Sequence, residues 1–202
     1  MKRASPEMIT TGHVGAYLTG AAWGILFVAI ILGSSGGFGE GTIWSAGVGA
    51  GILFVLLWVG GCVCEGIGWI GLARMRGTLA AVIGWITCTL PASYFILLML
   101  GAGTESPAVV YLMVLVQVSL YVLVLVHILG RRERAVKLPV AIGLVLAMIG
   151  ILGLTIAASN LEPGPSAVLF YVALSGMALT HLALASYFRL AAREARALDV
   201  FV

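Results

Sequence analysis

Six long apolar stretches dominate this 202-residue chain and determine what it can fold into. A helix that crosses a lipid bilayer needs roughly 20 predominantly apolar residues, because each residue rises only about 1.5 Å along the helix axis. The stretches are residues 15–33, 44–73, 77–101, 108–130, 138–158 and 165–191, and they leave no room for a separate soluble domain. The sequence therefore predicts an all-α, polytopic membrane protein, a bundle of six transmembrane helices in which residues 1–202 form one membrane domain.

The composition excludes the common soluble classes. Hydrophobic residues make up 61% of the chain and charged residues only 9%, whereas soluble domains are about one quarter charged. Nucleic-acid-binding and disordered proteins also need dense charge. We therefore expect the chain to contact the lipid bilayer and not nucleic acid.

The basic residues are sorted to one side of the predicted spans. All 11 Lys and Arg residues lie before the first span, in alternate connections, or at and after the end of the last span: Lys2, Arg3, Arg74, Arg76, Arg131, Arg132, Arg134, Lys137, Arg189, Arg193 and Arg196. The opposite connections contain only Glu40, Glu105 and Glu162. Basic residues beside membrane spans are retained in the cytoplasm. This sorting predicts that both termini are cytoplasmic (N-in and C-in) in a bacterial-type cytoplasmic (inner) membrane, with the net charge of +3 facing anionic lipid headgroups.

Both ends of the chain are expected to stay attached to the bundle. The first apolar run is long for a signal peptide, and no small-residue cleavage site follows it, so we interpret it as a retained span. Residues 189–202 place Arg189, Arg193 and Arg196 on one face of a continuing helix. This pattern predicts a cytoplasmic amphipathic tail along the membrane surface.

Apart from Arg189 at the end of the last span, Glu65 is the one formally charged side chain inside a predicted span. A carboxylate at this depth costs at least ~2.5–3.5 kcal/mol on insertion scales, so such residues usually face the interior of a bundle or a water-filled cavity. Gly61, Cys62 and Gly68 share its helix face, and small residues let another helix approach closely. We interpret Glu65 either as a site for a proton or a cation, or as a protonated carboxyl group bonded to a neighbouring helix.

Three further polar residues are candidates for the same site. His181 lies eight residues before Arg189, which places it at nearly the same depth in the membrane as Glu65. If their helices touch, Glu65 and His181 could hold or relay a proton. A single buried histidine bonded to a backbone carbonyl or a serine is the simpler alternative. Gln117 and Tyr121 lie one turn apart on the fourth span. They are expected either to hydrogen-bond between helices or to form a polar lining for a small solute.

Cofactor and metal sites have less support. His127 and His181 could supply the two axial ligands of a haem b. Cys62 and Cys64 point in different directions on one helix and chelate poorly. With Glu65 and His181 they could in principle supply metal ligands, but we interpret them as small packing residues and predict no metal site. The phosphate-binding motif G-x-x-x-x-G-K-[ST] and the zinc-protease motif H-E-x-x-H are missing from the sequence.

These observations leave three functional hypotheses. The leading one is a non-catalytic helical subunit or assembly partner of a larger membrane complex, either with other membrane subunits or as a homo-oligomer. The alternative is a small proton-linked transporter or channel that uses Glu65, with His181 as a possible partner. The third is a haem b electron carrier. A weak echo of LAAVIG (79–84) in LPVAIG (138–143) also raises the question of whether hairpins 77–130 and 138–191 are a repeat.

Overall fold

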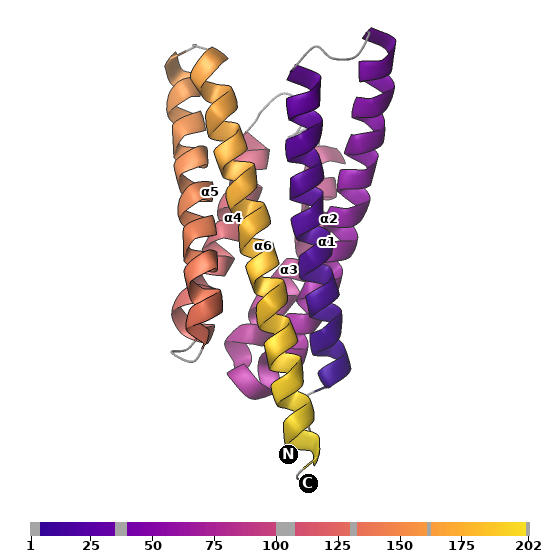
Figure 1. The fold of residues 1–202 in the computed structure, drawn as a ribbon, viewed down its shortest axis with the longest axis vertical. Coiled ribbons are helices and arrows are strands. Elements are labelled where there is room, and N and C mark those ends of the chain that lie inside the picture. The colour runs from indigo at the N-terminus through magenta and orange to yellow at the C-terminus, as the bar shows by residue number, and fades with distance from the viewer. Residues whose placement is uncertain (1–4, 35–39, 100–107, 130–132, 161–162, 201–202) are drawn as a thin grey trace.

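The computed structural model describes residues 5–34, 40–99, 108–129, 133–160 and 163–200, and this part of the chain is helical with no strand. Its elements are α1 (Pro6–Ser34), α2 (Glu40–Arg76), α3 (Thr78–Met99), α4 (Ala108–Leu123), the short π-helical segment η1 (Val124–Ile128), α5 (Arg134–Asn160) and α6 (Pro163–Val200) (Figure 1). The predicted all-α fold is confirmed.

Five of the described helices contain stretches that are long and apolar enough to cross a membrane. These stretches are Pro6–Ala29, Gly49–Arg76, Thr78–Ile96, Arg134–Gly153 and Tyr171–Leu198. The architecture is that of a multi-span membrane protein, as the sequence predicted. The fourth predicted span, 108–130, is the exception, because its described apolar stretch is the shorter Leu115–Ile128, at the end of α4 and through η1.

Two helices, α1 and α6, extend furthest beyond their predicted spans. The helix α1 begins at Pro6, well before residue 15. There the Ser5 hydroxyl accepts a hydrogen bond from the Met8 amide at 3.4 Å, and proline suits the first helical position. The helix α6 runs without interruption to Val200, so the predicted tail continues the last span as one helix. Phe201 and Val202 lie outside the described residues.

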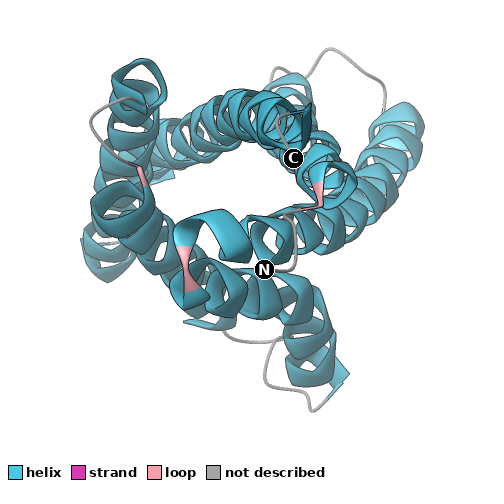
Figure 2. Ribbon diagram, turned by 90° about the horizontal axis from the view of Figure 1, so that it is seen from below, coloured by secondary structure: helices cyan, strands magenta, loops and turns pink. Residues whose placement is uncertain are grey.

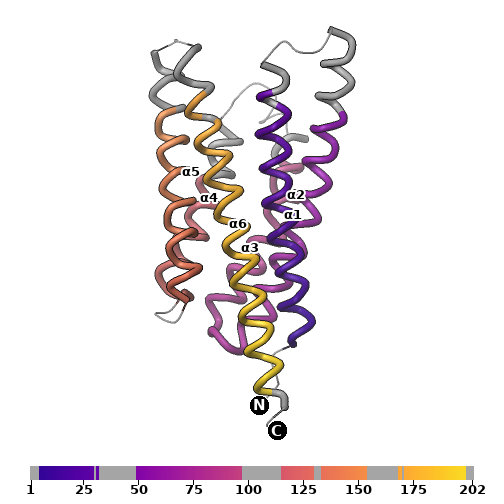
Figure 3. The backbone as a smooth tube through the Cα atoms, in the orientation of Figure 1, coloured from indigo at the N-terminus to yellow at the C-terminus, as the bar shows by residue number. Residues whose placement is uncertain are grey.

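The helices are arranged around α1 and α6. The helix α1 packs along both α2 and α6, while α3 packs on the other side of α2, and α5 packs along α6. By contrast, α4 touches α3 and α5 only lightly. Figure 1 shows α4 behind α5 and α6, and Figure 2 shows the helices of the bundle from one end. The backbone trace in Figure 3 shows α1, α2, α5 and α6 as long, nearly parallel rods. This arrangement makes α6 the most buried of the five span-length helices.

Glycines set the close approach of α1 to α2. A Cβ atom added to Gly12 would lie 2.6 Å from Cα of Gly68, and one added to Gly15 would collide with the backbone of Glu65. Similarly, a Cβ atom on Gly150 of α5 would lie 2.5 Å from Ala173 of α6. Without side chains the backbones can approach closely, which is how helices associate in lipid, where the hydrophobic effect does not drive them together.

One end of the bundle collects charged residues. The helix α1 begins and α6 ends at this end (Figure 1). Arg76, at the end of α2, contacts Glu133 before α5 at 2.7 Å and Glu194 of α6 at 3.4 Å. These ion pairs join three helix ends. Several charged residues of the predicted sorting lie outside the described residues: Lys2, Arg3, Glu105, Arg131, Arg132 and Glu162.

The two hairpins that the sequence echo suggested pack differently. Gly84 of α3 lies against Gly66 of the preceding helix, whereas Gly143 of α5 lies against Gly176 and Thr180 of the following helix. In addition, α5 packs along α6, while α3 barely touches α4. The corresponding residues of hairpins 77–130 and 138–191 therefore do not share one packing arrangement.

Replacing Gly15 with alanine is expected to destabilise the fold by about 1–3 kcal/mol, because the new methyl group would force α1 away from the α2 backbone. The matched control is Gly24→Ala on the same helix, where an added Cβ meets no atom within 4 Å. Thermal unfolding of both variants in mild detergent would measure the difference. Equal midpoints for the two variants would contradict the packing argument.

Candidate functional site

The carboxyl group of Glu65 is enclosed by helices. Glu65 lies on α2 with its side chain 0% exposed, and neighbouring Cys62 is equally buried. The absence of a side chain at Gly15 brings the α1 backbone directly against the main chain of Glu65. At about 1.5 Å per residue, Glu65 is roughly 16 Å from Arg76 at the end of the helix. A carboxyl group is thus buried far from either end of the bundle.

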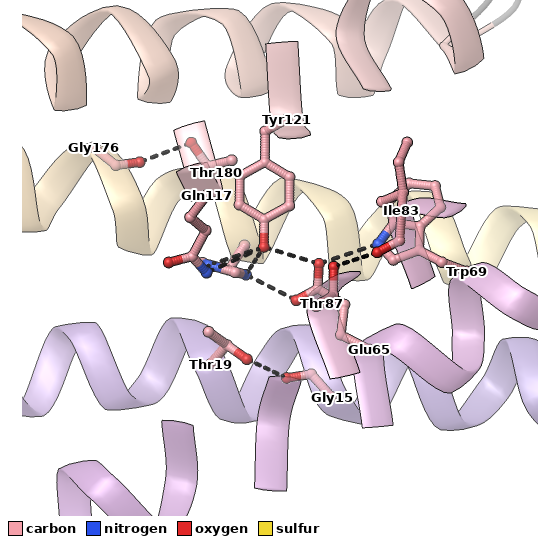
Figure 4. A network of polar contacts seen from close by, with 11 residues as sticks. Gly15, Thr19, Glu65, Trp69, Ile83, Thr87, Gln117, Tyr121, Gly176 and Thr180 are labelled. Atoms are coloured by element: carbon pink, nitrogen blue, oxygen red, sulfur yellow. Dashed lines mark hydrogen bonds and ion pairs between the residues drawn. The ribbon is translucent and has the colours of Figure 1, made fainter. Parts of the chain in front are cut away.

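Three donor side chains converge on this carboxyl group (Figure 4). Tyr121 Oη donates to Glu65 Oε1 at 3.0 Å, and the indole Nε1 of Trp69 donates to the same oxygen at 3.3 Å. His181 Nδ1 lies 3.0 Å from Glu65 Oε2. The donors come from α4, α2 and α6, and their side chains are as buried as the carboxyl group itself. Both oxygens of Glu65 therefore have partners.

Gln117 closes the contacts into a ring. Its Nε2 lies 3.2 Å from His181 Nε2 and 3.4 Å from Tyr121 Oη. The tyrosine and histidine rings also meet edge to face, with centroids 5.0 Å apart. We call Glu65, Trp69, Gln117, Tyr121 and His181 the polar network. It links three helices that are distant in sequence.

The donor and acceptor roles in the polar network follow from its chemistry. With the amide nitrogen of Gln117 as donor, Nε2 of His181 accepts and the ring carries its hydrogen on Nδ1; with the amide reversed, the tautomer would reverse as well. That hydrogen is donated to Glu65, which also receives hydrogens from Tyr121 and Trp69. A carboxyl group that accepts three hydrogen bonds and donates none is a carboxylate. The arrangement is a neutral histidine beside a negatively charged glutamate.

The hydroxyl groups around the polar network are bonded within their own helices. Thr19 donates to the Gly15 carbonyl at 3.0 Å, Thr180 to Gly176 at 2.9 Å and Thr87 to Ile83 at 2.8 Å (Figure 4). This pattern differs from the contacts between helices expected for polar groups in spans. A carbonyl four residues earlier is always within reach of a helical threonine, and no water competes for it in a membrane.

The two histidines proposed for haem do not form a ligand pair. His127 is exposed on η1, whereas both ring nitrogens of buried His181 are in contact with Glu65 and Gln117. His181 therefore has no nitrogen directed at an open position, and the residues present do not fit an axial haem pair. The remaining histidine, His13, contacts the Ala185 carbonyl through Nδ1 at 2.7 Å.

The cysteines are separate thiols in the described chain. Cys62, Cys64 and Cys88 form no disulfide, and Cys88 Sγ lies 3.5 Å from the Val63 carbonyl oxygen. Among the described residues, no group of three His, Cys, Asp or Glu side chains is placed to hold a metal ion. The small volume of the three cysteine side chains suits close helix packing.

Trp69 is a member of the polar network that sequence reasoning missed. It lies one helical turn after Glu65, so its position on the same face could have been recognised from the i, i+4 spacing. Its indole stacks on Tyr187 and meets Phe188 edge to face, with centroids 5.9 Å and 4.8 Å away. These aromatic contacts hold the indole nitrogen towards the carboxylate.

Removing the hydroxyl group of Tyr121 is expected to destabilise the protein by about 1–2 kcal/mol, because a buried carboxylate loses one donor. The variant is Tyr121→Phe, and Tyr94→Phe on α3 is its control, since that hydroxyl lies outside the polar network. Reversible unfolding in mixed detergent micelles would give both values. A loss no larger than that of the control would show that the 3.0 Å contact adds nothing to stability.

Comparison with known protein families, with curated proteins and with solved structures finds no match to this chain. The chemistry of the polar network is therefore the ground on which a function can be proposed.

Proposed function

We propose that this protein is a small proton-linked transporter or channel in which Glu65 and His181 bind the proton. The observation that carries the proposal is the 3.0 Å contact between a carboxylate and an imidazole, both 0% exposed, inside membrane-spanning helices. Intramembrane Asp, Glu and His residues commonly mark proton pathways. Histidine is also the side chain whose ordinary protonation change falls between pH 5 and 8.

The net charge of the pair supports proton exchange. With a carboxylate and a neutral imidazole, the pair is one negative charge in a medium of low dielectric constant. Among the described residues, no Lys or Arg side chain contacts either partner. A buried charge without a counter-charge is costly, and binding one further proton removes that charge. The polar network around the carboxylate offsets part of the cost of the charged form.

The proposed orientation places the charged end of the bundle in the cytoplasm. The basic residues Arg74, Arg76 and Arg193 belong to this end, where α2 and α6 finish. Positive residues at span ends favour the cytoplasmic side, and anionic headgroups of a bacterial-type inner membrane would face them. In this orientation α1 begins and α6 ends on the cytoplasmic side.

Purified protein in liposomes is expected to conduct protons in response to an imposed membrane potential, and Glu65→Gln is expected to abolish this flux. The glutamine keeps the size of the side chain but can neither lose nor gain the proton. A pH-sensitive dye trapped inside the vesicles reports the flux. The control is Glu7→Gln, which removes an exposed carboxylate at the start of α1.

Two results would contradict the proposal. Wild-type vesicles that are as proton-tight as empty vesicles would remove proton translocation as the function. Equal flux in wild-type and Glu65→Gln vesicles would remove Glu65 from the pathway, provided that both proteins elute as the same species from a sizing column.

A second candidate function is a subunit of a larger membrane complex, and the light packing of α4 favours it. Leu115, Val122, Leu123 and Val126 of the α4–η1 segment are exposed large apolar residues. A transmembrane helix from a partner, or from a second copy of this chain, could pack against this face.

The subunit proposal predicts a stoichiometric membrane partner. Tagged protein purified from its native host in mild detergent is expected to elute with another membrane protein, identified by mass spectrometry. A Leu115→Trp variant, which places a bulky ring on the exposed face, is expected to lose that partner. Protein that elutes as a monomer at native expression would argue against both a partner subunit and a homo-oligomer.

A further inference from the structure

Gln117 occupies an unusual position in the polar network, because its amide nitrogen lies between a histidine and a tyrosine. It is 3% exposed and faces His181 Nε2 at 3.2 Å and Tyr121 Oη at 3.4 Å. A side-chain amide carries two donor hydrogens on nitrogen and two acceptor lone pairs on oxygen. Rotation of the amide about the Cγ–Cδ bond exchanges the positions of its nitrogen and its oxygen. Gln117 can therefore either donate to the histidine or accept from it.

With the amide nitrogen of Gln117 towards the ring, the contacts fit the state in which Glu65 and His181 share one proton. In that state the proton is on Nδ1 of His181, between the ring and the carboxylate. Nε2 carries none, and it accepts from the amide nitrogen of Gln117.

A second proton changes the requirement at Nε2. If the proton adds to Nε2 of His181, the ring becomes an imidazolium with a hydrogen at both nitrogens. If the proton resides on Oε2 of Glu65 instead, the carboxyl group donates to Nδ1, and the ring hydrogen must move to Nε2. In both cases an N–H group at Nε2 would face the N–H group of Gln117. Two donors repel, so the amide must turn its oxygen towards the ring.

The other oxygen of Glu65 is a poor place for the second proton. A hydrogen on Oε1 would point towards Tyr121 Oη, which lies 3.0 Å away and already receives a hydrogen from Gln117. The tyrosine hydroxyl would then have a donor on each side, and its own hydrogen would have only the long 3.4 Å contact with His181 Nε2, which already accepts from Gln117. A buried donor with so poor an acceptor is costly, which disfavours this placement.

We propose that Gln117 is a positioning residue whose orientation depends on the number of protons that the Glu65–His181 pair binds. With one proton bound its amide nitrogen donates to His181, and with two protons bound its amide oxygen accepts from His181. This inference deepens the proposed function by adding a residue that responds to the proton. It concerns proton binding at equilibrium, and flux is not required to test it.

The rotation would connect proton binding to α4. Gln117 and Tyr121 are the buried polar residues of that helix, and α4 packs only lightly on α3 and α5. After the rotation the Tyr121 hydroxyl can donate its hydrogen either to the Gln117 oxygen or to Glu65. The hydrogen bonds that join α4 to α2 and α6 are thus different in the two proton states.

The groups that face His181 restrict what else could respond. Among the described helices, α2 contributes Glu65, and α4 contributes Tyr121. The neighbouring α1 residue is Gly20, whose added Cβ would lie 3.4 Å from the Cβ of His181. A pH-dependent change at this place is therefore assigned to the Glu65–His181 pair.

The chain is well suited to a direct test, because Gln117 is its sole glutamine and it has only 3 histidines. Full-length protein with ¹⁵N-labelled glutamine and histidine side chains would be studied in lipid bilayers by solid-state NMR across a range of pH. We expect His181 to carry its hydrogen on Nδ1 at high pH and Nε2 to become protonated on acidification. The Gln117 amide signal is expected to shift with the same midpoint.

A matched control separates this response from a general effect of pH. His127 is exposed on η1 and makes none of the contacts of the polar network, so its signal is expected to change independently of the Gln117 signal. In His181→Asn the Gln117 signal is expected to become independent of pH. A Gln117 signal that stays constant while His181 becomes protonated would overturn the proposal, as would a shift that persists in His181→Asn.

The result can be told apart from the outcome for transport. Vesicles without flux but with linked Gln117 and His181 signals would support the positioning role and contradict translocation. Flux with Gln117 and His181 signals that change independently would support translocation and contradict the positioning role. Should His181→Asn fail to fold, the wild-type titration alone still decides the matter, because a shared or a separate midpoint is measured without a variant.

Discussion

The constraint on which the structure depends is the burial of one carboxylate in a membrane-spanning helix. Apolar residues of similar size pack almost equally well in many helix arrangements, because lipid is as apolar as they are. Glu65 does not allow that freedom, since a buried carboxylate without hydrogen-bond donors is too costly to keep. Its donors lie on α2, α4 and α6. Satisfying this one group therefore selects which helices meet, and at which depth.

Glycine supplies the second condition, because donors reach the carboxylate only if the helices approach closely. Gly15 lets α1 lie against the backbone of Glu65, and Gly12 lets it lie against Gly68 one turn away. On the other side of the bundle, Gly143 and Gly176 bring α5 against α6 in the same manner. The glycines and the polar network thus act together, because close packing at the glycines lets the hydrogen-bond donors reach Glu65.

Hydropathy was sufficient to predict an all-helical membrane fold, and residue depth was sufficient to select Glu65 and His181 as candidates for one site. Their contact needed the tertiary structure, because equal depth does not say which helices are neighbours. The start of α1 was misplaced, since the prediction followed apolar residues and not the cap formed by Ser5 and Pro6. The face of His127 could not be derived from α-helical spacing, because it lies in a π-helical turn with more residues per turn.

A structural role and a functional role for the polar network are not alternatives in this fold. The contacts of Gln117 and Tyr121 with His181 and Glu65 join α4 to α6 and α2, beside the buried apolar side chains Val118 and Leu120 of the same helix. Those same contacts depend on how many protons the pair holds, because a hydrogen bond needs one donor and one acceptor. Any proton that enters the site must therefore change the forces on α4. In a bundle whose apolar contacts barely discriminate between arrangements, that polar change is the largest one available to move a helix.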